Sequence, residues 1–204
     1  MKLTNFQKEA LHGVMLGDGH LAKRSKTSTP HYTQTFGQKA GIFASHIYGL
    51  FLGFCSPRGF YTYMVQSGKN SPFYQRWIVS TLVSTEFQPF VDLYYTFNTL
   101  GKRIKILPKN IKDIISPVTL AYLVMSDGNI HKTHGIIRLC TNNFTKSEVQ
   151  LIADAIYSRY KIECRLEHVR KQQYIIVIRK SEVPKFQAIV KAHIIPTLMY
   201  RIGL

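Results

Sequence analysis

An internal repeat constrains this chain more than any other feature of its sequence. The segment LHGVMLGDGHL, Leu11 to Leu21, is matched 109 residues later by LAYLVMSDGNI, Leu120 to Ile130. Further along, the offset shrinks to 96, where Glu182 falls on Glu86, so the second copy is shorter by 13 residues. We therefore predict two tandem copies of one supersecondary unit with pseudo-twofold symmetry.

The first copy reads as helix, hairpin, helix, hairpin, helix. Thr4 and Gln7 have the spacing of a capping box for a helix that ends at Asp18. Apolar periodicity and β-branched or aromatic runs locate the remaining elements. These are strands His20–Lys23 and His31–Gly37, a helix Ala40–Phe54, a hairpin of Phe60–Gln66 and Phe73–Ser80, and a helix Glu86–Phe97.

The second copy shows the same order. Ser116 is placed to cap its first helix, with Pro117 at the first helical position. Thr145 and Glu148 form a second capping box, for a helix that reaches about Tyr160. The other elements are strands Ile130–Lys132 and Ile136–Thr141, a hairpin of Glu163–Val169 and Tyr174–Arg179, and a helix Glu182–His193.

These patterns predict an α+β protein with three segments. A first αββαββα unit spans residues 1–97, a basic linker with two prolines spans 98–118, and a second unit spans 119–204. The 204 residues suit two fused domains of about 100 residues each. An apolar content of 45% is enough for a core and excludes a disordered chain.

The charge balance indicates a polyanionic partner. Lys and Arg number 27 against 11 Asp and Glu, a net charge of +16 that is spread along the chain rather than confined to a tail. A broad basic surface favours nucleic acid first and an anionic membrane surface second. No stretch is long and apolar enough to span a bilayer. Of the two partners we expect nucleic acid and no membrane.

The cysteines give no sign of a disulfide framework or a zinc site. Cys55, Cys140 and Cys164 are odd in number and lack CxxC spacing. We expect reduced, packed thiols in an intracellular protein.

Both copies place an aspartate where a helix disfavours it. Asp18 and Asp127 follow apolar helical runs, and a carboxylate beside the negative end of the helix dipole costs free energy. One such residue would read as solvated or paired with a lysine. Two at matching repeat positions indicate a shared cation, because close carboxylates repel each other and hard divalent ions take oxygen ligands.

The residues around the aspartates fit this interpretation. Gly17 and Ser126 precede them and could lend main-chain oxygens to a metal. They are also small, as is Gly13, which permits close helix packing. Gly19 and Gly128 are interpreted as helix-ending glycines with positive φ.

At this point the chain resembles a known family. Leu11–Gly19 and Leu120–Gly128 look like the two motifs of the single-chain LAGLIDADG homing endonucleases, and the likeness covers nearly the whole chain. Here Leu16 and Met125 replace the family's earlier motif aspartate, and Tyr122 replaces its small third residue. The resemblance implies motif helices packed at the interface of the two units, each with a curved antiparallel sheet that forms a DNA-binding saddle.

The resemblance also implies the chemistry. It implies metal-dependent cleavage of both strands of a long DNA site with 3′ overhangs, by a monomer, with Asp18 and Asp127 as metal ligands. The metal would be Mg²⁺, with Mn²⁺ able to substitute and Ca²⁺ able to bind without cleavage. A basic residue follows the third helix of each unit in that branch, which maps to Lys105 and Arg201; the alternatives for these two are ordinary phosphate contact or a solvated surface charge.

The hairpins carry side chains that can read bases or touch phosphate, since Arg pairs with guanine and Gln with adenine. Each taken singly is more often a solvated surface residue than a base reader. The candidates for DNA contact are Lys23, Arg24, Lys26, Gln34, Gln38, Tyr61, Tyr63, Gln66, Lys69 and Arg76 in the first copy, and His134, Arg138, Arg165, Glu167, Arg170, Lys171 and Gln173 in the second. His12, within the first motif, is expected to be packed or capping.

Two other functions compete with the endonuclease. One is a maturase that binds intron RNA, as some relatives of this family do; the other is a DNA-binding regulator without catalysis. Retention of both Asp18 and Asp127 argues against each, because binding alone needs no carboxylate pair. By resemblance, an organellar location is also expected.

Overall fold

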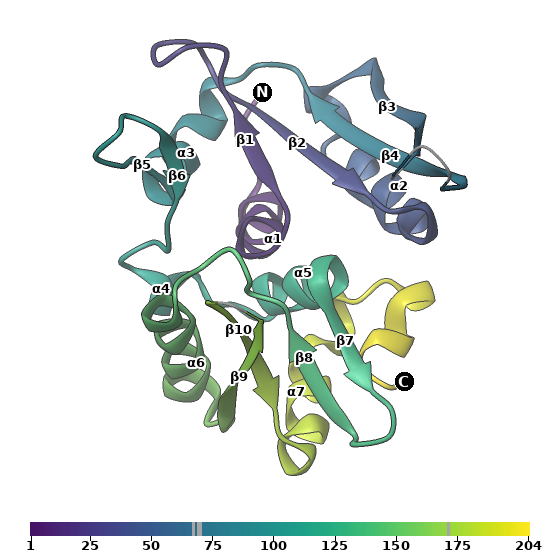
Figure 1. The fold of residues 1–204 in the computed structure, drawn as a ribbon, viewed down its shortest axis with the longest axis vertical. Coiled ribbons are helices and arrows are strands. Elements are labelled where there is room, and N and C mark those ends of the chain that lie inside the picture. Colours follow the sequence, from purple (N-terminus) through teal and green to yellow (C-terminus); the bar gives the residue numbers. More distant parts are fainter. Residues whose placement is uncertain (67, 69–70, 171) are drawn as a thin grey trace. The chain divides into compact units, whose positions relative to one another are not determined.

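The computed structural model describes residues 1–66, 68, 71–170 and 172–204. They form two compact units. Unit 1 consists of Met1–Gln7 and Asp18–Val91, and unit 2 of Lys8–Gly17 and Asp92–Leu204. Each contains one four-stranded antiparallel sheet with helices, which confirms the α+β class (Figure 1).

Unit 1 is built around the sheet β1-β2-β4-β3. Helix α1 (Asn5–Leu16) starts in this unit, where Thr4 and Gln7 form the predicted capping box, with hydrogen bonds of 2.9 and 3.2 Å. The other elements are β1 (His20–Ala22), β2 (His31–Phe36), η1 (Gln38–Ala40), α2 (Gly41–Leu50), η2 (Leu52–Phe54), β3 (Cys55–Gln66), β4 (Phe73–Thr81), η3 (Thr85–Phe87) and α3 (Gln88–Tyr94), which runs on into unit 2.

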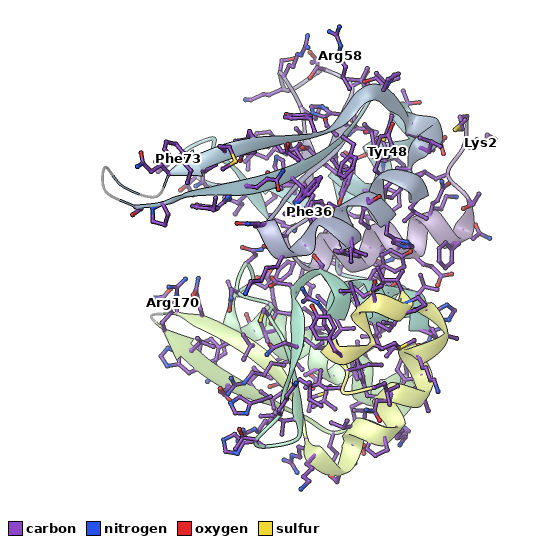
Figure 2. The ribbon with its side chains drawn as sticks, turned by 90° about the vertical axis from the view of Figure 1, so that its right-hand side faces the viewer. Lys2, Phe36, Tyr48, Arg58, Phe73 and Arg170 are labelled. Atoms are coloured by element: carbon purple, nitrogen blue, oxygen red, sulfur yellow. The ribbon has the colours of Figure 1, made fainter. Side chains whose placement is uncertain are left out.

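Helix α2 covers one face of this sheet, passing behind β4 and β3 in Figure 1. Phe36 of β2 meets Phe43 of α2 edge to face, and Tyr48 of α2 stacks on Phe60 of β3. Aromatic pairs of this kind add to the apolar burial that holds helix to sheet. Beyond α2, the β3–β4 hairpin continues to Phe73, which is 63% exposed at its free end (Figure 2).

Unit 2 is built around the sheet β7-β8-β10-β9. Its elements after α3 are β5 (Tyr95–Phe97), β6 (Arg103–Lys105), α4 (Ile111–Ile114), α5 (Pro117–Asp127), β7 (Gly128–His131), β8 (Ile136–Leu139), α6 (Lys146–Tyr160), β9 (Cys164–Arg170), β10 (Gln173–Ile178), η4 (Lys180–Glu182), α7 (Val183–Val190), η5 (Lys191–His193) and η6 (Pro196–Arg201). Both predicted caps are present: Ser116 Oγ accepts from the Thr119 amide, and Thr145 and Glu148 form a capping box.

The two sheets share one topology. In each, a first hairpin follows the motif helix, and a second helix separates it from a second hairpin. The last strand of the second hairpin, β4 or β10, lies in the sheet between its own hairpin partner and the first hairpin. The predicted strand and helix order is therefore found in both copies, which is what a tandem repeat requires.

The compact units differ from the boundaries drawn on the sequence. Residues 8–17, the body of the first motif helix, belong to unit 2 rather than to the first copy, and so do residues 92–97. Long-range packing of α1 on α5 causes this, and the repeat gives no sign of it.

Two predicted elements need correction. The helix expected over Glu86–Phe97 ends at Tyr94, and Tyr95–Phe97 forms β5, which pairs with β6. The predicted linker is therefore structured, since it holds β6, α4 and the start of α5. Gly101, at φ +70°, lies in the β5–β6 turn, where positive φ favours glycine.

Cys55, Cys140 and Cys164 form no disulfide among the described residues. Burial raises the pKa of the Cys55 thiol to about 11 and that of Cys164 to about 12, so both stay protonated at neutral pH. Within the described part of the chain, none of the helices combines the length and the apolar character that crossing a membrane requires.

Candidate functional site

The first motif helix packs closely on the second within unit 2. An added Cβ at Gly13 would lie 2.5 Å from both the Thr119 carbonyl oxygen and the Tyr122 Cβ. Tyr122 is the bulky residue at the matching position of the second copy, and it is buried. Gly13 therefore provides the space that Tyr122 occupies, and the departure of one copy from the small-residue pattern is complemented by the other.

The packing continues to the C-terminal ends of both helices. An added Cβ at Gly17 would lie 3.0 Å from Ser126 Oγ and 3.4 Å from Asp127 Cβ. Gly17 thus lies directly against the residues that close the second motif. Helix α1 ends at Leu16 rather than at the predicted Asp18, which follows in a turn and is exposed.

Gly128 is required for a reason other than the predicted one. Its φ of −122° and ψ of 161° are extended values, open to any residue. An added Cβ, however, would lie 2.5 Å from Val124 Cγ2 and 2.8 Å from Val124 Cα. Steric exclusion by the last turn of α5 explains this glycine. Gly19 likewise is absent from the positive-φ glycines of the described residues, which are Gly101, Gly135 and Gly203.

Lys105 reaches the end of the first motif helix from β6. Its ammonium group donates a 2.9 Å hydrogen bond to the Gly17 carbonyl oxygen and lies 5.9 Å from the centroid of the Phe144 ring. Asn143 Nδ2 lies 3.4 Å from the same oxygen. A carbonyl at a helix C-terminus lacks an intrahelical donor, so it attracts cations.

Arg201 makes a similar contact beside the second motif. It ends η6, and its Nη1 donates a 2.7 Å hydrogen bond to the carbonyl oxygen of Gly128, the residue after Asp127. Its Nε is buried without a hydrogen-bond partner in the described structure. The two predicted basic residues therefore each bind a main-chain oxygen within one residue of a motif aspartate in the sequence.

The opposite ends of the motif helices are joined by a polar network. Ser116 Oγ, the cap of α5, donates to the Glu9 carboxylate of α1. Thr119 Oγ1 donates to the Glu9 carbonyl oxygen at 3.1 Å. Here the carboxylate lies at the positive end of α5, which is electrostatically favourable. In the middle of α1, His12 Nδ1 lies 3.1 Å from the Tyr94 hydroxyl, and burial lowers the His12 pKa to about 4, which confirms a packed histidine.

The unit 1 sheet has one packed and one open face, and the register assigns each predicted base reader to one of them. Cross-strand partners share a face and alternate residues change face. Tyr61 pairs with Ile78 and Tyr63 with Arg76, so the two tyrosines and Arg76 lie on the open face. Tyr61 is 48% exposed and Tyr63 39%.

Gln34, predicted to contact DNA, lies on the packed face of the sheet. It pairs with buried Val79, is 4% exposed, and accepts a hydrogen bond from the Tyr32 hydroxyl. The open face of β2 instead carries its odd positions, His31, Thr33 and Thr35. Gln66 also has the even parity of the packed face, at the hairpin end, where its amide donates to the Ser71 carbonyl oxygen.

In the unit 2 sheet, three predicted readers lie together. Arg138 pairs with Val177, which pairs in turn with Arg165, and Glu167 pairs with the neighbouring Ile175. Glu167 forms ion pairs with Arg138 at 3.1 Å and with Arg165 at 3.4 Å. The three side chains therefore lie on one face of the unit 2 sheet.

The remaining candidates lie in turns or at strand ends. Arg24 and Lys26 are exposed in the β1–β2 loop, while the ammonium of Lys23 donates to Gln88 Oε1 at 3.2 Å. Gln38 is exposed in η1. His134 is exposed in the β7–β8 turn and stacks on His131. Arg170, at the end of β9, donates to Gln173 at 2.8 Å (Figure 2). Lys69 and Lys171 lie outside the described residues.

Sequence reasoning missed two residues that the structure places beside predicted ones. The Tyr74 hydroxyl accepts from Arg76 at 3.2 Å on the open face of unit 1. Its parity matches that of Arg76, a signal present in the sequence. Asn143, which approaches Gly17, lies in a loop between β8 and α6, and no local pattern identifies it.

The donors around the motif ends suit a hard divalent cation. The residues that meet there carry oxygens: Gly17 has its carbonyl, and the Ser126 hydroxyl and the Asp127 Cβ would lie 3.0 and 3.4 Å from an added Cβ at Gly17. The Gly17 carbonyl already draws the Lys105 ammonium, so this helix end attracts positive charge. Among the described residues no group of three His, Cys, Asp or Glu side chains converges, so a metal here would depend on main-chain, water or substrate oxygens as well.

Comparison with solved structures supports the fold. The structure of the homing endonuclease I-WcaI bound to its DNA recognition sequence matches with a TM-score of 0.84 and 24% identity, over 99% of this chain and 88% of that one. At this identity the likeness shows a common fold.

Comparison with sequences points to one family. The model of the LAGLIDADG DNA endonuclease family matches residues 8–186. The DNA endonuclease I-ChuI of Chlamydomonas applanata is 24% identical over the whole chain and 97% of its own length. The cytochrome b mRNA maturase bI2 of Saccharomyces cerevisiae is 27% identical over 95% of this chain, which spans only 46% of that protein. The chain belongs to the LAGLIDADG DNA endonuclease family.

Proposed function

We propose that this protein is a sequence-specific, divalent-metal-dependent endonuclease that cuts both strands of a long DNA site and leaves 3′ overhangs. The observation that carries the proposal is the close packing of α1 on α5, which brings Gly17 against Ser126 and Asp127. Asp18 is the next residue after Gly17, one peptide bond away. We infer that Asp18 and Asp127 share a cation, because close carboxylates repel each other unless a positive charge lies between them.

Asp18 and Asp127 would hold the metal, with the main-chain oxygens of Gly17 and Ser126 as further donors. Mg²⁺ is the expected ion, with Mn²⁺ as a substitute and Ca²⁺ as a ligand that permits binding without cleavage. When bound, such an ion stabilises the charge that develops on phosphate oxygens and helps to activate water.

Lys105 and Arg201 would supply fixed positive charge. Each is tied to a main-chain oxygen beside a motif aspartate, at 2.9 and 2.7 Å. A cation held in place before the substrate arrives stabilises a developing phosphate charge without a cost of reorganisation. Arg201 cannot act in proton transfer, because a guanidinium does not lose its proton in proteins.

DNA would bind along the open sheet faces. The net charge of +16 provides phosphate affinity, and Tyr61, Tyr63, Arg76, Arg138 and Arg165 are candidates for base contacts. The structural relative I-WcaI is bound to its DNA recognition sequence. In this proposal the two copies, residues 1–97 and 119–204, act as one monomer on an asymmetric site.

Cleavage-site selection from randomised DNA with Mg²⁺ tests the proposal. We expect the wild-type chain to cut a defined long site, and Asp18→Asn and Asp127→Asn each to abolish double-strand cleavage while DNA binding is retained. Cleavage that survives both substitutions would contradict the assigned metal ligands. Binding of a defined site with no cleavage under any metal would instead indicate a DNA-binding regulator.

A second candidate is intron RNA splicing. The yeast relative that matches 95% of this chain is named a cytochrome b mRNA maturase, and other relatives are named intron-encoded endonucleases. These names also favour an organellar location. An in vitro splicing assay of the host intron with Asp18→Asn and Asp127→Asn separates the roles, since RNA binding should survive loss of the carboxylates.

A further inference from the structure

Glu167 is a negative charge between two arginines on a face that otherwise suits DNA. Its two carboxylate oxygens accept separately, Oε1 from Arg138 at 3.1 Å and Oε2 from Arg165 at 3.4 Å. The three side chains come from β8 and β9, on either side of the central strand β10. The carboxylate thus ties together two strands that do not pair with each other.

The register places this cluster above buried apolar residues. Val177 lies between Arg138 and Arg165 and is fully buried, and Ile175 beside Glu167 is 4% exposed. The alternate residues Ile137, Leu139, Ile176 and Ile178 form the opposite face and are fully buried. The cluster therefore lies on the face opposite this buried one, with its charged ends partly exposed: 30% for Arg138 and Glu167 and 54% for Arg165.

Stability gives little reason for the cluster. Ion pairs at this exposure contribute little to folding, because solvent screens them. Arg138 also has a buried Nε without a hydrogen-bond partner in the described structure, which is a cost rather than a gain. A carboxylate on a DNA-facing surface repels phosphate and therefore lowers the affinity for DNA. A gain in selectivity between sites would account for its presence.

In the described part of unit 1, the arginine of the open face contacts a neutral group instead of a carboxylate. There Arg76 is held by a neutral group, the Tyr74 hydroxyl at 3.2 Å, beside Tyr61 and Tyr63. Among the described residues, the open face of unit 1 sets Arg76 beside three tyrosines, whereas that of unit 2 holds Arg138 and Arg165 with the Glu167 carboxylate between them. The two sheets should therefore select base pairs by different chemistry.

We infer that Glu167 is a specificity-determining residue, which orients Arg138 and Arg165 toward guanine edges in the half-site read by unit 2 and discourages non-specific phosphate contact. This rests on the proposed function, because it assumes that the face binds duplex DNA. Two guanidiniums fixed in orientation discriminate guanine from other bases better than mobile ones do.

The test is selection of bound duplexes from a randomised pool without divalent metal, followed by titration of the selected duplex, its single-base-pair variants and a random duplex. Four full-length proteins are compared: wild type, Glu167→Gln, Glu167→Asp and Asp154→Asn. Asp154 is exposed on α6, so its substitution makes the same charge change away from the cluster. Thermal melting verifies that each variant is folded.

We expect the wild type to require G·C pairs in one half-site. Glu167→Gln should reduce discrimination at those positions about tenfold, the effect of losing one good base contact. It should also bind the random duplex about threefold more tightly, since one repulsive charge is gone. Glu167→Asp, which keeps the charge and withdraws it from the arginines, should lose discrimination without that gain. Asp154→Asn should match the wild type.

A wild type that selects a site while Glu167→Gln selects the same site with equal discrimination overturns the inference and leaves the proposed function intact. Equal changes in Asp154→Asn and Glu167→Gln would also overturn it, because net charge alone would then explain both. A wild type that selects no sequence and cuts none with Mg²⁺ refutes the proposed function, and the inference with it.

Discussion

The ammonium group of Lys105 donates a 2.9 Å hydrogen bond to the carbonyl oxygen of Gly17. Lys105 belongs to β6, far along the chain, whereas Gly17 follows the last residue of the first motif helix. The bond fixes a cation beside Gly17, the residue that precedes the motif aspartate Asp18. The hydrogen bond therefore determines where the positive charge of Lys105 lies relative to the motif. Substitution of Lys105 tests the contribution of that charge.

Lys105→Met should lower the cleavage rate roughly 100-fold, the usual cost of removing one preorganised electrostatic group. DNA affinity should change little, because one phosphate contact at most is lost. Single-turnover cleavage and a binding titration on the same duplex measure the two effects. Lys102→Met is the matched control, since Lys102 is exposed just before β6. An equal loss in both variants would show that only overall charge matters.

Arg201→Met should remove the 2.7 Å bond to Gly128 and reduce cleavage, while Arg201→Lys should restore part of the rate because the positive charge returns. Loss of a charged hydrogen bond should also lower the free energy of unfolding by about 2 kcal/mol. Cleavage kinetics and urea unfolding test this pair. Arg179→Met, at an exposed ion pair with Glu163, should leave cleavage unchanged. Full activity in Arg201→Met would refute the assigned role.

Gly13→Ala should destabilise the packing of α1 on α5. The new methyl group would lie 2.5 Å from the Thr119 carbonyl oxygen and from Tyr122 Cβ, and overpacking of this kind costs about 1–3 kcal/mol. Urea unfolding measures the loss. Gly49→Ala is the control: Gly49 is exposed in α2 with nothing within 4 Å, so alanine there should stabilise by up to about 1 kcal/mol. Equal effects at both positions would contradict close packing at Gly13.

Because of His12, the free energy of unfolding should depend on pH. Burial lowers its pKa to about 4 from 6.5, so the folded state resists a proton that the unfolded state accepts. Stability is therefore complete above pH 6.5 and falls as the pH drops toward 4. Between pH 6.5 and 5 the loss from this group should be about 2 kcal/mol.

His12→Gln should remove that component of the pH dependence while keeping a polar group near Tyr94. Burial holds the pKa of the Tyr94 hydroxyl above its ordinary range, so it stays protonated throughout. The measurement is the free energy of unfolding at pH 6.5 and 5 for both proteins. The same fall with pH in wild type and variant would exclude His12 as its source.

Local patterns predicted the elements well where short-range contacts decide them. The capping boxes at Thr4 and Thr145 and the cap at Ser116 are all present, because each is a hydrogen bond between residues three apart. The motif repeat likewise indicated the family and the two carboxylates. By contrast, β5 could not be recognised in Glu86–Phe97, since its partner β6 is formed by a segment that reads as a linker.

The prediction that Gln34 contacts DNA was wrong, although the alternation of residues along β2 could have corrected it. Gln34 lies between Tyr32 and Phe36 at alternate positions of β2, and those two aromatics mark the packed face. Glutamine is a residue type that reads bases, which suggested DNA contact for Gln34. Its even position in β2, however, places it on the same face as Tyr32 and Phe36, in the core. Parity outranks residue type here, because burying a hydrogen-bonded amide costs less than exposing two aromatic rings.

By itself, the sequence determined the repeat, the order of helices and strands, the helix starts and the two aspartates, since all of these rest on spacing and short-range hydrogen bonds. Only the tertiary structure decided that the body of α1 packs in unit 2, that Gly13 accommodates Tyr122, and that Lys105 and Arg201 each bind a main-chain oxygen beside a motif. These are contacts between residues about 70 to 110 positions apart, and they follow from which surfaces are buried together, a property that no local pattern contains.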